Sequence, residues 1–202
     1  MGILSFLGFQ NNSVPKNFSF EEQLEIFKEL GFELSHGTDK SDIERWDEQD
    51  FLGEPFSLMY ITLGQTIEHE PWTPLTNKCW DFETEAIEDH GSYVEIFENL
   101  ERITRGSLKF KNVKDYVDIE EEKAWVSFTF NGKDYKWNLK VDNDWVDTDL
   151  FSKIVNLTEN DNSKGGYTYF DTGGQNAVIG FETAESLKEI KNKTGLKIVW
   201  LN

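Results

Sequence analysis

The dipeptide Asn131-Gly132 constrains the fold more than any other short feature of this 202-residue chain. Asn-Gly is a preferred pair for a two-residue type I′ turn, which joins two antiparallel strands. The residues on both sides alternate apolar and polar side chains. The sequence therefore predicts a hairpin over residues 125–141. The turn also sets the cross-strand neighbours on the apolar face, pairing Phe128 with Tyr135 and Val126 with Trp137.

Four helices are predicted where a capping residue precedes apolar residues at helical spacing. The expected N-caps are Ser19, Ser92, Asp147 and Thr183. The two serines also begin capping boxes, because a Glu follows each of them three residues later. A weaker helix is expected over Ser41–Gln49.

Further strands are expected in four apolar segments: Phe56–Leu63, Tyr167–Phe170, Ala177–Phe181 and Leu196–Leu201. The first is continuously apolar, which favours a central strand. The last two flank the helix after Thr183, so they form a βαβ-like or split unit. Gly173-Gly174 lies between two expected strands and indicates a hairpin turn rather than a phosphate-binding loop. The fold class is thus α+β, a mixed or antiparallel sheet with about four helices packed mainly on one side.

The length and the aromatic content favour one packed domain over residues 19–202, since 16 Phe, 7 Trp and 6 Tyr can bury a large apolar area. Residues 1–18 are expected to be an N-terminal extension. The polar segment 159–166 could divide the domain loosely. The single cysteine, Cys79, allows no internal disulfide and is expected to be a small buried apolar residue.

The acidic charge is concentrated in one half of the chain. Residues 1–101 carry 5 basic and 22 acidic side chains, whereas residues 102–202 carry 15 and 16. A net charge of −18 argues against nucleic-acid binding, which needs a basic surface. No stretch approaches the roughly 20 apolar residues of a membrane helix. The N-terminus lacks the features of a signal peptide, and we expect a cytoplasmic protein.

Motifs for catalysis or metal binding are weak. The histidines His36, His69 and His90 do not stand at the spacing that presents two ligands on one helix face. Asp142–Asp149 begins like a calcium-binding loop but lacks the Gly and the final Glu of an EF-hand, so we interpret it as a turn followed by a helix N-cap. We therefore predict no cofactor, no metal and no catalytic residue.

Aromatic side chains alternate with acids in the first half, a combination typical of protein-binding surfaces. We interpret Trp80 and Phe82 as core residues, since strand alternation places them on one face. The predicted partner-binding residues are Asp47, Glu48, Glu68, Glu70, Trp72, Glu83, Glu85, Glu88, Asp89 and Tyr93. The expected partner is a basic protein. The alternative is that the acids only make the surface soluble.

In general character the chain resembles the immunity proteins of bacterial polymorphic and contact-dependent toxin systems. The resemblance lies in the acidic charge, the many aromatic residues, the single α+β domain and the absence of a catalytic motif. It implies a protein that occludes a basic toxin stoichiometrically. Two other functions stay open: a general interaction or adaptor domain, and a small metal-dependent hydrolase that uses His69, His90 and nearby carboxylates.

Overall fold

The computed structural model describes residues 18–43, 48–159 and 165–202. In these residues six α-helices and seven strands form an α+β fold, as expected. Residues 1–17 of the predicted extension and residues 160–164 of the segment 159–166 lie outside the described residues. The helices are α1 (Phe20–Glu29), α2 (Glu48–Gly53), α3 (Ser57–Gly64), α4 (Ser92–Ile103), α5 (Asp149–Glu159) and α6 (Ala184–Thr194), with a short 3₁₀ helix η1 (Lys40–Asp42). The strands are β1 (Cys79–Glu83), β2 (Phe110–Asp118), β3 (Lys123–Phe130), β4 (Lys133–Leu139), β5 (Gly166–Asp171), β6 (Asn176–Glu182) and β7 (Val199–Trp200).

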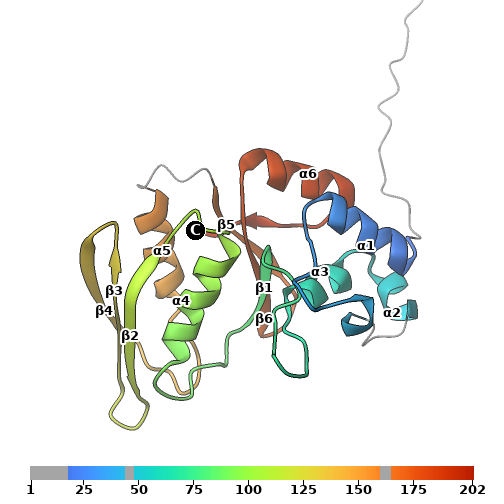
Figure 1. The fold of residues 1–202 in the computed structure, drawn as a ribbon. Helices are drawn as coiled ribbons and strands as arrows, with labels where there is room; N and C mark the ends of the chain where they lie inside the picture. The colour runs from blue at the N-terminus through green and yellow to red at the C-terminus, as the bar shows by residue number, and fades with distance from the viewer. Residues whose placement is uncertain (1–17, 44–47, 160–164) are drawn as a thin grey trace, which may run out of the picture.

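The strands form two antiparallel sheets, ordered β2-β3-β4 and β1-β6-β5-β7. Helices α4 and α5 fill the space between the sheets, and α1, α2, α3 and α6 cover the far face of the four-stranded sheet (Figure 1). We expected one sheet with helices mainly on one side. That description fits the three-stranded sheet, but the four-stranded sheet is covered on both faces. The reason is visible in β6, where every residue from Ala177 to Glu182 is buried.

The Asn131-Gly132 hairpin is confirmed, with Phe128 opposite Tyr135 and Val126 opposite Trp137. Asn131 and Gly132 both have positive φ, 49° and 76°, as a type I′ turn requires. The buried side chains of β3 face α4 and α5, so this hairpin closes one side of the first core.

The prediction of a central strand over Phe56–Leu63 is wrong, because these residues form helix α3. A short continuous apolar run has the same pattern in a buried strand and in a buried helix. Helix α3 is enclosed by the second core, and five of its eight residues are buried. It lies so close to β1 that a Cβ atom at Gly64 would stand 2.6 Å from the backbone nitrogen of Asp81.

Two of the four predicted N-caps, Ser19 and Thr183, are observed in the structure. Ser19 forms its capping box with Glu22, Thr183 caps α6, and Gly195 ends α6 in the left-handed conformation. The expected capping box at Ser92 is wrong: Gly91 is the N-cap of α4, with φ 99° and no side-chain cap of its own. The weaker helix over Ser41–Gln49 is replaced by η1 and α2, with residues 44–47 outside the described part of the chain.

The C-terminal split unit is present, because β5 lies between β6 and β7 in the sheet. Strand β7 is only two residues long, shorter than the expected segment Leu196–Leu201. Cys79 is fully buried in the second core, and burial raises the pKa of its thiol well above the ordinary range. In the described part of the chain, no helix has the length and apolar character needed to cross a membrane.

Candidate functional site

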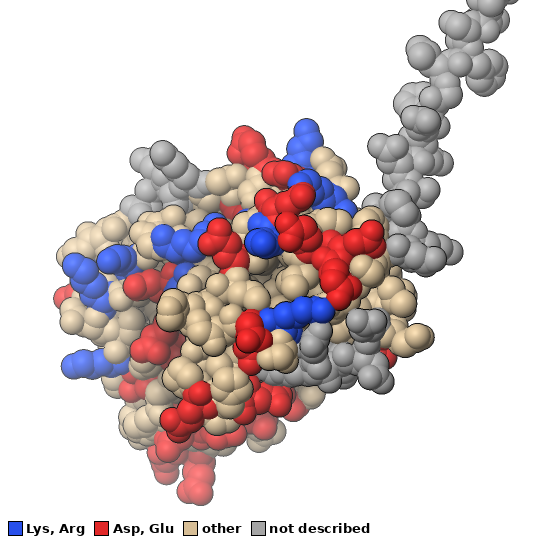
Figure 2. All heavy atoms as spheres, turned by 45° about the vertical axis from the view of Figure 1, so that its right-hand side comes forward, with Lys and Arg blue, Asp and Glu red and all other residues tan. Residues whose placement is uncertain are grey.

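One end of the molecule carries an unusual concentration of acids. Strands β1, β2, β4 and β5 end there, and helices α4 and α5 begin there (Figure 1). We name this surface the acidic edge; it comprises residues 83–91, 118–122, 141–149 and 171–175. The first three segments contain four acids each and the fourth contains one, together 13 of the 38 acids of the chain, and none contains Lys or Arg. Figure 2 shows acidic side chains gathered at this lower end of the molecule.

Backbone hydrogen bonds join three of these segments. The N–H of Ile87 donates to the carbonyl of Asp144 at 2.9 Å, and the N–H of Val146 donates to the carbonyl of Thr84 at 2.9 Å. The Thr84 hydroxyl donates to the carbonyl of Gln175 at 2.7 Å. Residues 84–87 therefore connect the ends of the two sheets.

The fourth segment, 118–122, adjoins the others through aromatic and polar contacts. The rings of His90 and Tyr116 lie 4.8 Å apart, and the Tyr116 hydroxyl donates to Asp118 at 3.2 Å. This last hydrogen bond raises the pKa of Tyr116. The acidic edge is therefore one continuous surface built from segments that are far apart in the sequence.

Two carboxylates, Asp147 in the acidic edge and Asp115 in the adjoining strand β2, have a structural role at the helix ends. The carboxylate of Asp115 accepts hydrogen bonds from the N–H groups of Gly91, Tyr93 and Val94 at the start of α4. Asp147 accepts from the N–H groups of Lys140 and Asp149 near the start of α5. Negative charge at a helix N-terminus is stabilised by the helix dipole.

Other acids of the edge are exposed to solvent. They are Glu83, Glu88, Asp89, Glu120, Glu121, Glu122, Asp142, Asp144, Asp149 and Asp171. Lys123 pairs with Glu121 at 3.1 Å and Lys140 with Asp142 at 3.7 Å, and all four of these side chains are exposed. Exposed ion pairs of this kind reduce the negative electrostatic potential of the acidic edge only slightly. Hydrogen bonds from the backbone and then the ring of His90 lower the pKa of Asp89, which keeps that carboxylate charged.

A groove opens within the acidic edge beside Trp145, whose side chain is 39% exposed. We name it the Trp145 groove. Its volume is about 390 Å³, and its floor includes the buried side chains of Phe82, Phe151 and Ile179. Asp149 and Gln175 contribute polar groups to its lining. An apolar floor with a few polar groups is the usual composition of a binding site.

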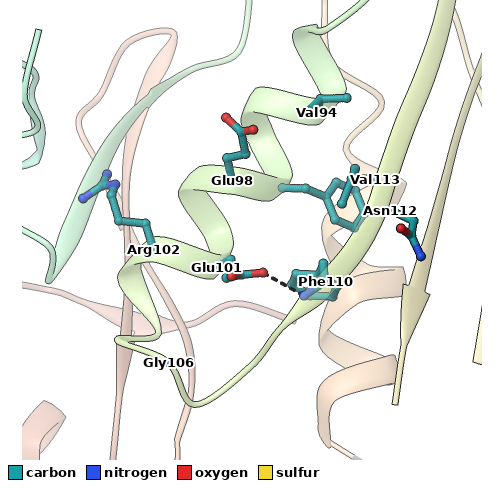
Figure 3. A pocket seen from close by; sticks show the side chains of 9 residues that line it. Val94, Glu98, Glu101, Arg102, Gly106, Phe110, Asn112 and Val113 are labelled. Carbon is teal, nitrogen blue, oxygen red and sulfur yellow. Dashed lines mark hydrogen bonds between the residues drawn. The ribbon is translucent and has the colours of Figure 1, made fainter. Parts of the chain in front are cut away.

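A second groove, of about 630 Å³, separates helix α4 from strand β2 (Figure 3). Of the charged residues that line it, Glu101 and Arg102 make contacts within the chain. Glu101 accepts a hydrogen bond from the N–H of Phe110 at 2.8 Å, and Arg102 donates to the carbonyl of Thr76 at 2.6 Å. Glu98 is exposed at the rim. The Trp145 groove differs from this one in having an exposed tryptophan in its lining.

Comparison with protein-family models, with curated proteins and with solved structures finds no match for this chain. The candidate site therefore rests on its own geometry.

The structure brings four of the predicted partner-binding residues together. Glu83, Glu85, Glu88 and Asp89 all lie in the acidic edge, with Glu85 half-buried. The remaining acids of the edge were missed because the prediction compared the net charge of residues 1–101 with that of residues 102–202 and chose binding residues only from the first half. The acidic runs 118–122 and 142–149 were a local signal that could have revealed them.

Three more predicted residues, Glu68, Glu70 and Trp72, are exposed on the loop between α3 and β1. Ile67 and Leu75 anchor this loop in the second core, so it lies on the other side of the four-stranded sheet from α4 and α5. Trp72 is 58% exposed. This loop is a separate surface and adds nothing to the Trp145 groove.

The assignment of Tyr93 to a binding surface is wrong. Its side chain is 1% exposed in the first core, and its hydroxyl accepts a hydrogen bond from the N–H of Asp147 at 3.3 Å. Tyr93 instead supports the acidic edge from within, because it joins α4 to the segment before α5. Asp47 lies outside the described residues, and Glu48 begins helix α2.

The two histidines suggested for a metal-dependent enzyme lie in separate places. The Nε2 atom of His69 is 2.9 Å from Asp42 Oδ1, whereas Nδ1 of His90 is 2.7 Å from Asp89 Oδ1. Among the residues that the structure describes, no group of three or more His, Cys, Asp or Glu side chains could hold a metal ion. The segment 142–149 forms the turn before α5, in keeping with its interpretation as a turn and helix start.

Proposed function

We propose that this protein binds a basic protein partner through the acidic edge and neutralises it by covering its positively charged surface. The observation that carries the proposal is that four separate segments contribute acids to one surface that also presents an exposed tryptophan. Trp is enriched at the energetic centre of protein interfaces, and surrounding charges accelerate the encounter with a partner of opposite charge. Neutralising a basic toxin, as immunity proteins do, is the form of this function that the sequence favours.

The density of charge also supports a binding role. Like charges held close together repel one another and lower the stability of the folded state. Capping of α4 and α5 accounts for Asp115 and Asp147, but the exposed acids of 83–89 and 118–122 make no such contribution. A cationic partner would offset that repulsion on binding.

The test compares two variants of equal net charge. The edge variant replaces four exposed acids of the acidic edge, Glu88→Gln, Asp89→Asn, Glu120→Gln and Glu122→Gln. The control variant replaces four exposed acids elsewhere, Glu33→Gln, Glu54→Gln, Glu98→Gln and Glu185→Gln. Each set changes the formal net charge from −18 to −14. A difference between them thus reports the position of the charge and not its amount.

Tagged wild-type protein and both variants are used to capture partners from the source cell at low salt, followed by mass spectrometry. We expect one basic protein in stoichiometric amount with the wild type and the control variant, and little with the edge variant. Capture should weaken between about 50 and 300 mM salt, since exposed charges are screened over about 8–10 Å at physiological ionic strength. Equal capture by both variants would contradict the proposed surface.

The neutralising role has its own readout. The captured protein is produced in a host cell with and without this chain, and growth is measured. We expect growth arrest that wild-type protein relieves and the edge variant does not. A captured partner that leaves growth unchanged in both cases would favour an adaptor over an immunity protein.

A further inference from the structure

The backbone around Trp145 is held in place, so the exposure of the indole is a property of the fold. The N–H of Trp145 donates to the carbonyl of Asp142 at 3.1 Å. The residues on either side of Trp145 make the two hydrogen bonds to segment 84–87 described above. A large aromatic side chain is therefore presented to solvent from a fixed segment, at the mouth of the groove.

The charge of the groove has one sign. Asp149 is the charged residue of its described lining, and no Lys or Arg contributes to that lining. Asp142 and Asp144 are exposed beside Trp145 in the chain. The occupant that complements these groups combines an apolar stem with a positively charged head.

We propose that the Trp145 groove receives an arginine side chain of the basic partner, with its guanidinium against the Trp145 indole and its stem over the apolar floor. This inference rests on the proposed function and names the anchor of that interaction. Arginine suits the site better than lysine does, because its planar guanidinium stacks on aromatic rings and donates several hydrogen bonds in a fixed fork. Asp149 and Gln175 supply acceptors in the same groove.

The chain provides an internal control for this chemistry. Trp200 is 40% exposed and borders a second acidic hollow lined by Glu159, Glu182 and Glu185. That hollow lies where β5 and α6 begin, at the end opposite to the acidic edge. A nonspecific attraction between cations and exposed tryptophans would act at both places.

The experiment titrates the full-length ¹⁵N-labelled protein with a capped hexa-arginine peptide and, separately, with hexa-lysine of equal charge. Trp145→Ala and Trp200→Ala assign the two indole N–H signals and serve as site and control variants. We expect hexa-arginine to shift the Trp145 indole signal and the amides of Thr148 and Gln175, and to bind more tightly than hexa-lysine. Trp145→Ala should raise the dissociation constant for hexa-arginine by about 3- to 30-fold, and Trp200→Ala should leave it unchanged.

A further variant tests the groove without removing Trp145, in case Trp145→Ala disturbs the folded structure. Thr148→Arg places a cation on an exposed residue of the groove lining and leaves Trp145 intact. We expect it to weaken hexa-arginine binding by a similar factor while the amide spectrum stays folded.

The outcomes separate this inference from the proposed function. Shifts at the Trp145 groove, lost in both groove variants, support the arginine anchor. Shifts confined to Asp89 and Glu120–Glu122, with the same affinity in Trp145→Ala, would overturn the anchor and leave the acidic edge as the binding surface. Equal affinities for the two peptides in every variant would also overturn it, and absence of any binding at low salt would count against both.

Discussion

Both carboxylate oxygens of Asp115, on strand β2, accept a hydrogen bond from the backbone N–H of Gly91, at 2.8 and 2.9 Å. Asp115 thus performs the capping task that the sequence assigns to Ser92. At the other end of the same helix, Glu101 on α4 accepts from the N–H of Phe110 on β2. Helix and strand are therefore fastened by one carboxylate each, near the two ends of the helix, and Figure 3 shows the contact between Glu101 and Phe110.

We expect Asp115→Ala to lower the free energy of unfolding by about 1–2 kcal/mol, the usual cost of removing an N-cap acceptor. Ser92→Ala should cost less than about 0.5 kcal/mol, since the Ser92 hydroxyl accepts only long bonds from the N–H groups of Glu88 and Asp89, at 3.3 and 3.4 Å. Urea unfolding of the two variants measures the difference. A larger loss for Ser92→Ala would restore the capping box predicted from the sequence.

This helix shows what a single sequence can and cannot reveal. The extent of α4 was predictable because its apolar residues repeat at helical spacing. Its cap was not, because Asp115 lies 24 residues beyond Gly91 and only tertiary structure brings the two together. Strand β2 was missed for a local reason. Its register shifts between Lys111 and Lys114, and Asn112 adopts φ 54°, which interrupts the alternation that marks a strand.

The acidic edge was only partly predictable, because tertiary structure also brings its segments together. Glu83, Glu85, Glu88 and Asp89 are close in sequence and formed a visible cluster. That 118–122 and 141–149 join them depends on the antiparallel pairing of both sheets, which no local pattern specifies. Tyr93 was misassigned because a Tyr next to acids has the same sequence context in a core as on a surface.

Gly64→Ala tests the close approach of α3 to β1. Ala favours a helix over Gly by about 1 kcal/mol, yet the new Cβ would meet backbone atoms of Trp80 and Asp81 that cannot move aside without shifting the sheet. We expect a net loss of about 1–3 kcal/mol in urea unfolding. Gly53→Ala, in α2, is the matched control, since a Cβ there meets nothing within 4 Å. An unchanged or increased stability of Gly64→Ala would contradict this packing.

Lys78→Met tests the buried ion pair between Lys78 and Glu182, 3.6 Å apart with side chains 9% and 3% exposed. The Lys78 ammonium also donates to the carbonyl of Leu30 at the end of α1. Burial lowers the pKa of Lys78, while the charge of Glu182 opposes that shift. Removing the cation leaves a buried carboxylate without its partner, and we expect a loss of about 3–5 kcal/mol in urea unfolding.

The double variant Lys78→Met/Glu182→Gln completes that experiment. Because it removes both charges, its cost should be smaller than the sum of the two single variants. Strict additivity would show that the two side chains do not interact.

Tyr167→Phe tests a pH dependence. Burial raises the pKa of Tyr167 well above its ordinary value of 10, so the folded chain keeps a proton that the unfolded chain loses. The stabilisation is therefore complete below about pH 10 and declines as the pH rises further. At pH 8 the variant should lose about 0.5–1.5 kcal/mol, since the Tyr167 hydroxyl donates to the carbonyl of Leu100.

Urea unfolding of the wild type and of Tyr167→Phe, measured from pH 8 to 11, gives the difference between their free energies of unfolding at each pH. The difference in free energy of unfolding between wild type and Tyr167→Phe should become smaller above pH 10, because only the wild type loses the contribution of that hydroxyl. A difference that stays constant over the whole range would refute the assignment to Tyr167.

Strand β1 finds its partner late in the chain, since Cys79 pairs with Gly180. During synthesis β1 itself has no neighbouring strand until β6 has been made, about 100 residues later. The long loop between β1 and β6 must also close before the two strands can pair, which places this pairing among the slow steps of folding. The surface that we propose for partner binding is thus complete only once β6 has been made, and a chain interrupted before β6 would display the same acids with β1 unpaired.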